Sequence, residues 1–294
     1  MNPKVSIVLP CYNGAKMLGD AIESVINQTF KDWELIIVND CSTDNTLEVA
    51  QSYAERDDRI RVFSNEKNSK LPATLNHGFC EAKGEFWTWT SDDNLLMPTM
   101  LEEMSSYLNS FHDIGMVVSD YYTINEKGEI CGEVYVCDNL NEYLLSNNGV
   151  GASFMYRSDV AKQVGPYRED LFLVEDYEYW LRLSFNTKIS TLHRFLYKYR
   201  VHNGSLTATR KEGIAAAKVK MRIQYLPKVE EKLQSNTKAL LLYYYRIADN
   251  LNGKQRWQFI RMFTKKYPIQ FGVKYFLIHY PHYKWRSLFT DMRN

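Results

Sequence analysis

The fold of this chain is decided by Phe86-Trp87-Thr88-Trp89-Thr90, which runs directly into Ser91-Asp92-Asp93-Asn94. Aromatic and β-branched residues after Gly84 favour a buried strand, and the small polar residues that close it predict a strand end facing solvent or a ligand. In open α/β sheets, ligands bind outside the carboxyl ends of the strands, so this pair of acids is well placed to hold a divalent cation and a hydroxylated ligand. From these residues alone, a helix-capping Asp92 beside a solvated Asp93 is an equal alternative.

The residues upstream alternate between strand and helix patterns. Short apolar or β-branched runs that stop at turn residues predict strands, and apolar residues at helical spacing predict helices. The predicted strands are 5–9, 35–38 and 60–63, and the predicted helices are 15–27, about 42–53 and about 72–82. Strands and helices in series with short connections imply parallel strands joined by right-handed crossovers, which is the α/β class.

Beyond residue 98 the alternation is less regular. We expect helices over 98–108 and about 175–184, and strands over 116–118, 130–136, 152–156, 189–192 and 196–200. From residue 211 onward the pattern is helical, basic and aromatic.

Charge is divided unevenly along the chain. Residues 1–209 contain 18 Lys and Arg against 30 Asp and Glu, whereas residues 210–294 contain 18 against 5. Such an asymmetry is typical of segments with different partners, so we place a boundary between residues 209 and 210. With 294 residues and 45% hydrophobic content, the chain can bury a full core, as one large domain with an appendage or as two modest domains.

Several classes of protein are disfavoured by composition. Five cysteines at irregular spacing indicate neither a disulfide framework nor a zinc site and favour a reducing compartment. The first ten residues are typical of a first strand rather than an export signal, and the longest apolar runs, 239–245 and 275–283, fall below the roughly 20 residues that span a bilayer. We therefore expect a cytoplasmic protein.

A second acid follows a neighbouring predicted strand. Asp40 comes directly after Ile36-Ile37-Val38. If both strands are parallel, Asp40 and Asp92 point into one crevice, and such carboxylates suit a nucleotide, because they accept hydrogen bonds from a base N–H and from ribose hydroxyls. A helix cap or turn residue is the alternative for Asp40.

Four stretches in order resemble the motifs of family 2 glycosyltransferases: Val5-Ser6-Ile7-Val8-Leu9-Pro10-Cys11-Tyr12-Asn13-Gly14, Ser24-Val25-Ile26-Asn27-Gln28-Thr29-Phe30, Trp33-Glu34-Leu35-Ile36-Ile37-Val38-Asn39-Asp40-Cys41-Ser42-Thr43-Asp44, and Thr90-Ser91-Asp92-Asp93. The resemblance covers about residues 4–205. It implies a GT-A fold, with a Rossmann-like, mostly parallel central sheet flanked by helices and a C-terminal helical extension. The catalytic domain would be 1–209, with a nucleotide-sugar half over about 1–97 and an acceptor half over about 98–209, followed by the extension over 210–294.

The resemblance also implies roles on the donor side. Pro10, Tyr12 and Asn13 would line the nucleotide pocket, Asp40 would contact the base, and Asp92 would approach the ribose or sugar. Asp93 would coordinate Mg²⁺ or Mn²⁺ bridging the diphosphate. His202, in Tyr199-Arg200-Val201-His202-Asn203-Gly204-Ser205, would ligate the metal or contact the diphosphate. A lone loop histidine is otherwise a surface or packing residue.

A second acidic element resembles the part of the family that carries the catalytic base. Within Leu173-Val174-Glu175-Asp176-Tyr177-Glu178, Asp176 would take the proton of the acceptor hydroxyl in an inverting transfer. Glu175 points about 100° away on a helix and belongs to the acceptor side. Gly151 and Ser153 would line the acceptor side as well. The alternatives are an acidic helix start stabilised by the helix dipole and a tight turn at the glycines.

The chain departs from the family pattern at two places. Lys70 stands where many relatives have a glycine, and it either reaches the nucleotide or is solvated. Asn39 and Cys41 replace the usual acid and glycine beside Asp40, which makes the identity of the nucleotide harder to infer.

The basic tail over 210–294 mixes Lys and Arg with Trp, Tyr and Phe, as in Lys254-Gln255-Arg256-Trp257. On a helix this mixture suits peripheral contact with the inner face of the cytoplasmic membrane. Packing of a helical subdomain on the catalytic core and a dimer interface are, taken together, an equal alternative. No recognised nucleic-acid-binding module supports nucleic acid as a partner.

We therefore expect an inverting, metal-dependent enzyme that moves a sugar from a nucleotide-diphosphate sugar, UDP-sugar favoured, to a hydroxyl of a glycan or lipid-linked acceptor in surface polysaccharide synthesis. The alternatives are a sugar nucleotidyltransferase and a non-catalytic nucleotide-sugar-binding adaptor. The sequence leaves the oligomeric state open.

Overall fold

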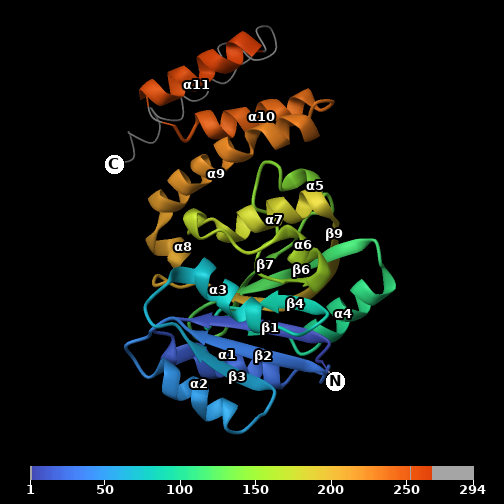
Figure 1. Cartoon of the computed structure of the whole chain (residues 1–294), viewed down its shortest axis with the longest axis vertical. Coiled ribbons are helices and arrows are strands. Elements are labelled where there is room, and N and C mark those ends of the chain that lie inside the picture. The colour runs from blue at the N-terminus through green and yellow to red at the C-terminus, as the bar shows by residue number, and fades with distance from the viewer. Residues whose placement is uncertain (1, 252, 267–294) are drawn as a thin grey trace. The chain divides into compact units, whose positions relative to one another are not determined.

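The computed structural model describes residues 2–251 and 253–266 and is shown in Figure 1. The chain forms two compact units, Met1–Ala217 and Lys218–Asn294. Their division lies inside helix α9 (Lys211–Lys232), a few residues after the change in charge along the sequence.

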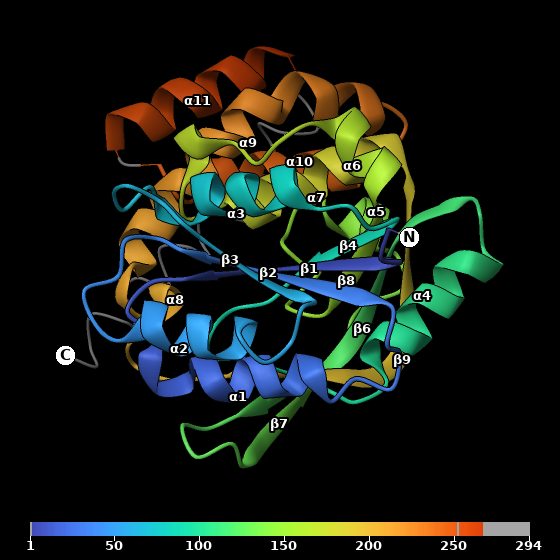
Figure 2. The ribbon, with the colours of Figure 1, turned by 60° about the horizontal axis from the view of Figure 1, so that its bottom comes forward.

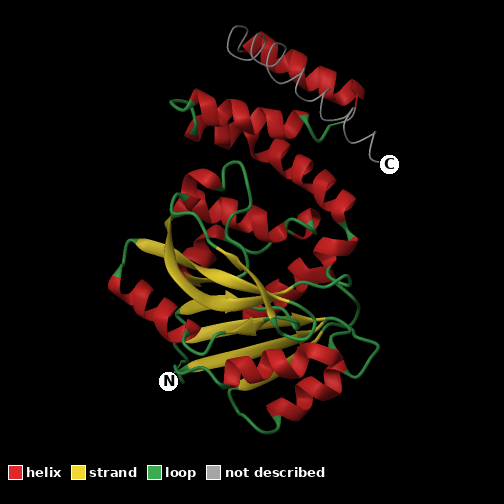
Figure 3. Cartoon of the chain, turned by 180° about the vertical axis from the view of Figure 1, so that it is seen from behind, coloured by secondary structure: helices red, strands yellow, loops and turns green. Residues whose placement is uncertain are grey.

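The first unit is built on a continuous, curled sheet (Figure 3). Nine strands form it among the described residues, in the order β3-β2-β1-β4-β8-β6-β9-β5, with β7 paired to β6. Their bounds are β1 Val5–Cys11, β2 Trp33–Asn39, β3 Ile60–Ser64, β4 Phe86–Trp89, β5 Leu95–Leu96, β6 Ile114–Ile124, β7 Ile130–Val134, β8 Phe154–Arg157 and β9 Lys188–Arg200.

Strands β1 to β4 are mutually parallel, as the alternation of strand and helix predicts. The apolar side chains of β1 and β2 are buried on both faces because helices cover the sheet on both sides: α3 (Lys70–Glu81) on one face, and α1 (Ala15–Ile26) and α2 (Thr46–Ala54) on the other (Figure 2). Strand β1 lies between β2 and β4, so the ends of β2 and β4, with Asp40 and Asp92 just beyond them, flank the end of β1.

The C-terminal half of the unit is mixed. Strand β8 joins β4 and β6 in antiparallel fashion, whereas β9 runs parallel to β6. The helices here are α4 (Met100–Ser110), α5 (Leu140–Tyr143), α6 (Ser158–Val164), α7 (Glu175–Asn186) and α8 (Leu206–Thr209), with a 3₁₀ turn at Glu169–Leu171.

Three local expectations differ from the structure. The short strand predicted over 116–118 is the eleven-residue strand β6. The predicted strands 189–192 and 196–200 are one strand, β9, whose pairing with β6 shifts register near residues 119–121, so that a bulge interrupts the apolar pattern without ending the strand. No helix follows Asp92 directly, because residues 92–94 turn into the short strand β5. Asp92 is therefore not a helix cap.

The second unit contains the end of α9, then α10 (Thr237–Ala248) and α11 (Gly253–Lys266). Its core is aliphatic and aromatic, with Val229, Tyr243, Tyr244, Ile247 and Phe263 almost completely buried. None of the helices in the described part of the chain is long and apolar enough to cross a membrane. The predicted apolar run 275–283 lies outside the described residues.

Candidate functional site

A cleft of about 1020 Å³ opens beyond the ends of β1, β2 and β4. Eleven of the twelve predicted site residues line it: Pro10, Tyr12, Asn13, Asp40, Lys70, Asp92, Asp93, Gly151, Glu175, Asp176 and His202. The twelfth, Ser153, is fully buried, with its Oγ 2.6 Å from Ser119 Oγ, while its neighbours Ala152 and Phe154 line the cleft. The structure thus brings together acids that are up to 136 residues apart in sequence.

Asp40 is held by the start of the next helix. Its Oδ1 accepts hydrogen bonds from Asn65 Nδ2 (2.8 Å) and the Ser69 N–H (2.7 Å), and its Oδ2 accepts one from the Lys70 N–H (3.0 Å). A carboxylate has about four acceptor positions, so Oδ2 retains one for a ligand. The carboxylate is thus fixed in place and keeps a single direction in which it can bind an N–H.

Lys70 has a left-handed backbone, with φ of 72°. This conformation turns the Lys70 N–H onto Asp40, and glycine adopts it without the penalty that a Cβ brings. A glycine at this position would be unstrained, whereas the lysine here carries backbone strain. Its side chain is exposed along the cleft and forms no ion pair with another described residue.

Asp92 lies against the first turn of α1. A Cβ at Gly14 would overlap Asp92 Oδ2, so only glycine leaves room for the carboxyl group at this point. Burial, followed by the charge of Asp93, raises the pKa of Asp92 to about 7. A hydroxyl donor or a cation placed here would stabilise the charged form.

Asp93 and His202 face each other from opposite halves of the unit. His202 Nε2 lies 2.9 Å from Asp93 Oδ2, while Asp93 Oδ1 is buried and finds no hydrogen-bond partner among the described residues. A buried carboxylate oxygen without a donor is costly, which indicates that a ligand completes it.

Arg200 fixes this pairing, a role that was not predicted from the sequence. It is buried, its Nε donates to the Asp93 carbonyl (2.8 Å), and its backbone N–H donates to Asn94 Oδ1 (2.8 Å). Its Nη1 also binds the carbonyls of Asn125 and Glu126. The guanidinium therefore joins the turn after β4 to the end of β9. The sequence signal for this role is the position of Arg200, two residues before His202.

These residues fit a divalent cation. No group of three or more His, Cys, Asp or Glu residues that could hold a metal occurs in the described part of the chain. Mg²⁺ and Mn²⁺ nevertheless need only one or two protein ligands when a phosphate supplies the rest, and Asp93 Oδ1 with His202 Nε2 provides such a pair.

Glu175 and Asp176 begin α7 in different environments. Asp176 accepts hydrogen bonds from Asn148 Nδ2 (2.9 Å) and from the Tyr177 N–H (2.6 Å), which both favour the charged carboxylate. Burial, and then the charge of Asp176, raises the pKa of Glu175 to about 8. Near neutral pH Glu175 therefore keeps its proton, whereas Asp176 is oriented by hydrogen-bond donors. Asn148 was missed in the sequence because a lone loop amide carries no pattern.

A comparison of the sequence with known families decides what kind of protein contains this cleft. The chain matches the family described as Glycosyl transferase family 2 over residues 6–165, which is more than half of its length. The chain belongs to glycosyltransferase family 2. The predicted membership is thereby confirmed.

Relatives of this family 2 glycosyltransferase occur in distant organisms. It is 32% identical over 220 residues to an uncharacterized glycosyltransferase of Rickettsia typhi. The aligned region covers 71% of this chain and 67% of the relative. It is also 32% identical over 209 residues to an uncharacterized glycosyltransferase of Methanocaldococcus jannaschii, covering 68% and 72%.

Solved structures confirm the predicted GT-A fold. S. aureus TarS 1-349 in complex with UDP-GlcNAc has a TM-score of 0.67 at 19% identity, over 88% of this chain and 79% of that one. The mannosyltransferase PcManGT from Pyrobaculum calidifontis, in complex with GDP-Man and Mn²⁺, has a TM-score of 0.62 at 15% identity, over 94% and 88%.

An aromatic wall begins at one side of the glycosyltransferase cleft and continues behind it. Trp89 lines the cleft at the end of β4, and its Nε1 donates to Tyr167 Oη (3.0 Å). Tyr167 stacks on Tyr179 of α7, with ring centroids 4.0 Å apart. The wall thereby couples the strand that leads to Asp92 to the helix that carries Asp176.

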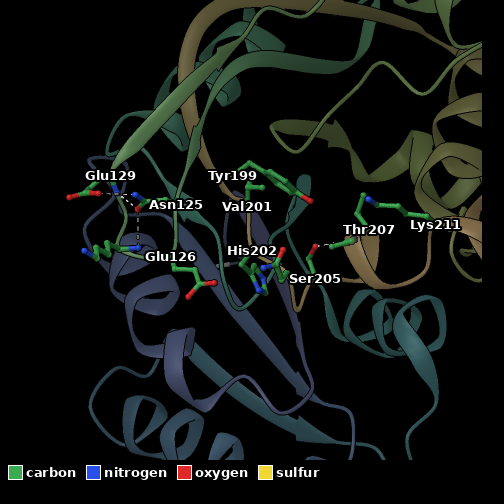
Figure 4. Close-up of a pocket in the computed structure, with 12 residues that line it drawn as sticks. Asn125, Glu126, Glu129, Tyr199, Val201, His202, Ser205, Thr207 and Lys211 are labelled. Carbon is green, nitrogen blue, oxygen red and sulfur yellow. Dashed lines mark hydrogen bonds between the residues drawn. The ribbon is translucent and has the colours of Figure 1, made fainter. Parts of the chain in front are cut away.

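A second, more open cavity of about 620 Å³ adjoins the cleft (Figure 4). The turn 125–129 forms one side of it, and residues 199–211 form the other. It shares Tyr199, His202, Ser205 and Thr207 with the cleft, so the segment that ends β9 separates the two.

Proposed function

We propose that this glycosyltransferase is inverting and metal-dependent, and that it moves a sugar from a nucleotide-diphosphate sugar, UDP-sugar favoured, to a hydroxyl of a glycan or lipid-linked acceptor. The observation that carries the proposal is the arrangement of two acid sites in one cleft, Asp93 beside His202 and Asp176 beside Glu175. The sugar-nucleotide complexes of TarS and PcManGT support the donor class.

The donor would bind in the half of the cleft built on β1, β2 and β4. Asp40 offers its remaining acceptor position to an N–H of the base, beside the wall formed by Pro10, Tyr12 and Asn13. Asp92 accepts hydrogen bonds from ribose or sugar hydroxyls, which favour its charged form. Lys70 extends its ammonium group toward the diphosphate, where it offsets part of the negative charge.

Asp93 and His202 would hold Mg²⁺ or Mn²⁺ against the diphosphate. When bound, such an ion supplies Lewis-acid stabilisation of the negative charge that grows on the departing nucleoside diphosphate. The buried Oδ1 of Asp93 would thereby gain a partner that none of the described residues provides.

Asp176 would act as the base. Its carboxylate, oriented by Asn148, takes the proton of the acceptor hydroxyl while that oxygen attacks the anomeric carbon from the face opposite the leaving group. Glu175 and Gly151 contribute to the acceptor side, where a protonated Glu175 can donate a hydrogen bond to an acceptor oxygen. We place Ser153 beneath this surface as its support.

The remaining part of the proposal concerns location. A polysaccharide acceptor on a lipid carrier lies at the inner face of the cytoplasmic membrane, and the excess of Lys and Arg over 210–294 suits peripheral contact there. We propose that the enzyme acts in surface polysaccharide synthesis at this face.

The test separates donor binding from transfer. Thermal shift with a panel of nucleotide sugars, with and without Mn²⁺, identifies the donor, because a ligand of the folded state raises its apparent stability. With that donor, Asp176→Asn should bind normally and lose transfer by about 100-fold or more, the usual contribution of a positioned base. Asp58→Asn, at an exposed acid outside the cleft, is the control. Full transfer by Asp176→Asn would refute the assignment of the base.

A further inference from the structure

Helix α11 (Gly253–Lys266) has two distinct faces within the second unit. Phe259, Ile260 and Phe263 are buried, and the ring of Phe263 lies on Tyr244 of α10, with centroids 3.7 Å apart. Residues 254, 257, 261, 262 and 265 recur at the spacing of a single helical side, on the opposite face. The buried face therefore fixes which residues the helix presents outward.

The outward face combines cations with large apolar groups. Lys254, Arg261 and Lys265 are exposed there, and the side chains of Trp257 and Met262 are each 52% exposed. The helix contains five Lys and Arg and not one acid. Apolar side chains of this size, beside cations and on a helix without acids, suit a surface that is both apolar and negatively charged.

We infer that this outward face of α11 is the surface through which the enzyme contacts an anionic lipid bilayer. Trp257 and Met262 enter the headgroup region, and Lys254, Arg261 and Lys265 bind anionic headgroups. The complete absence of acids from the helix gives charge complementarity to such a bilayer. The inference rests on the membrane contact proposed above for 210–294 and names the residues that carry it.

Flotation of the full-length protein with vesicles tests the inference. Vesicles of phosphatidylglycerol and phosphatidylcholine should carry the protein upward, whereas vesicles of phosphatidylcholine alone should not, and raising the salt concentration should weaken the binding because it screens the charges. The double variant Arg261→Gln/Lys265→Gln should weaken vesicle binding about 30-fold, because it removes two cations that each make the usual contribution near such a surface.

A matched control exists in the same unit. Lys228 and Lys232 are exposed on α9 with the same four-residue spacing, so Lys228→Gln/Lys232→Gln removes equal charge from a different surface. This control should float like the wild type. Met262→Gln should also weaken vesicle binding, with thermal unfolding unchanged because Met262 is 52% exposed.

An equal loss of vesicle binding in Arg261→Gln/Lys265→Gln and Lys228→Gln/Lys232→Gln would refute the assignment to α11, because net charge alone would then explain the binding. Wild-type binding in the Arg261/Lys265 variant would refute it as well, while leaving membrane contact elsewhere in 210–294 intact. If the wild type stays in solution with anionic vesicles, both membrane statements are wrong. The transferase proposal is judged separately, by the Asp176→Asn assay.

Discussion

Replacing Lys70 by glycine should make the protein more stable and its donor binding weaker. The residue has φ of 72°, and its N–H must point at Asp40 Oδ2 in that conformation. A left-handed residue with a Cβ costs about 1–2 kcal/mol, whereas glycine adds about 0.5–1 kcal/mol of chain entropy to the unfolded state. The net gain in stability is thus about 0.5–1 kcal/mol.

The loss in donor binding follows from the side chain. An ammonium group that binds a phosphate oxygen makes a charge-assisted hydrogen bond, which contributes about 1.5–3 kcal/mol. Lys70 is exposed, so water competes for the phosphate and the lower end applies, which corresponds to about tenfold in Kd. Stability and affinity should therefore change in opposite directions at one position.

Two measurements check this prediction. Thermal unfolding of the free protein should show a rise in Tm of about 1–3 °C for Lys70→Gly, given the size of the first unit. Isothermal titration with the donor and Mn²⁺ should show the weaker binding. Lys70→Met keeps the strained backbone and loses the charge, so it should bind as weakly as the glycine variant without the gain in Tm.

Cys41→Gly is the matched control, because Cys41 has φ of 59° and does not line the cleft. It should gain stability by a similar amount and bind the donor normally. Wild-type donor affinity in both Lys70→Gly and Lys70→Met would refute the reasoning and show Lys70 to be a solvated residue whose strain has no role in binding.

Three further outcomes are expected. Gly14→Ala should lower the free energy of unfolding, measured in urea, by about 1–3 kcal/mol, since its Cβ would overlap Asp92. Gly19→Ala, inside helix α1, should leave this free energy unchanged because its Cβ would make an ordinary contact. The raised pKa of Glu175, caused mainly by burial, means that the folded state keeps a proton that the unfolded state loses, so stability should fall as the pH rises from about 4.5 to 8. Glu175→Gln should flatten this part of a Tm-against-pH curve, and an unchanged curve would contradict the raised pKa. Asp93→Asn should abolish the part of the donor-induced rise in Tm that requires Mn²⁺, and full retention of that part would place the metal elsewhere.

The donor half of the cleft could be predicted because the topology of a parallel sheet leaves little choice. Asp40 and Asp92 follow strands that flank β1, and the carboxyl ends of parallel strands meet at one edge. Periodicity and turn residues locate those strands from local sequence alone. The buried apolar runs of β1 and β2 carry this signal most clearly.

The acceptor half and the supporting contacts could not be derived from local patterns. His202 meets Asp93 across 109 residues, and only the resemblance to a family indicated that the two belong together. Arg200, which fixes this meeting, binds three backbone carbonyls, and such partners leave no trace in the identity of the residues that offer them. The fully buried Ser153, just before β8, shows the converse, since residue type does not reveal whether a small polar side chain will face the cleft or the core.

Backbone strain gives a separate reason to regard the cleft as a binding site. Within the described residues, the non-glycine positions with left-handed φ are Asn13, Cys41, Lys70 and Leu173. Three of them line the cleft, and Cys41 directly follows Asp40. Strain of this kind persists where neighbouring contacts fix it, as when Asn13 Oδ1 accepts the Thr43 N–H at 2.8 Å. A fold that needed only stability could carry glycine at these positions. The concentration of three of them around one cleft therefore indicates that loop geometry there is set by what the cleft binds. Lys70, the strained residue whose charge faces the cleft, is the position where stability and ligand binding are most directly opposed.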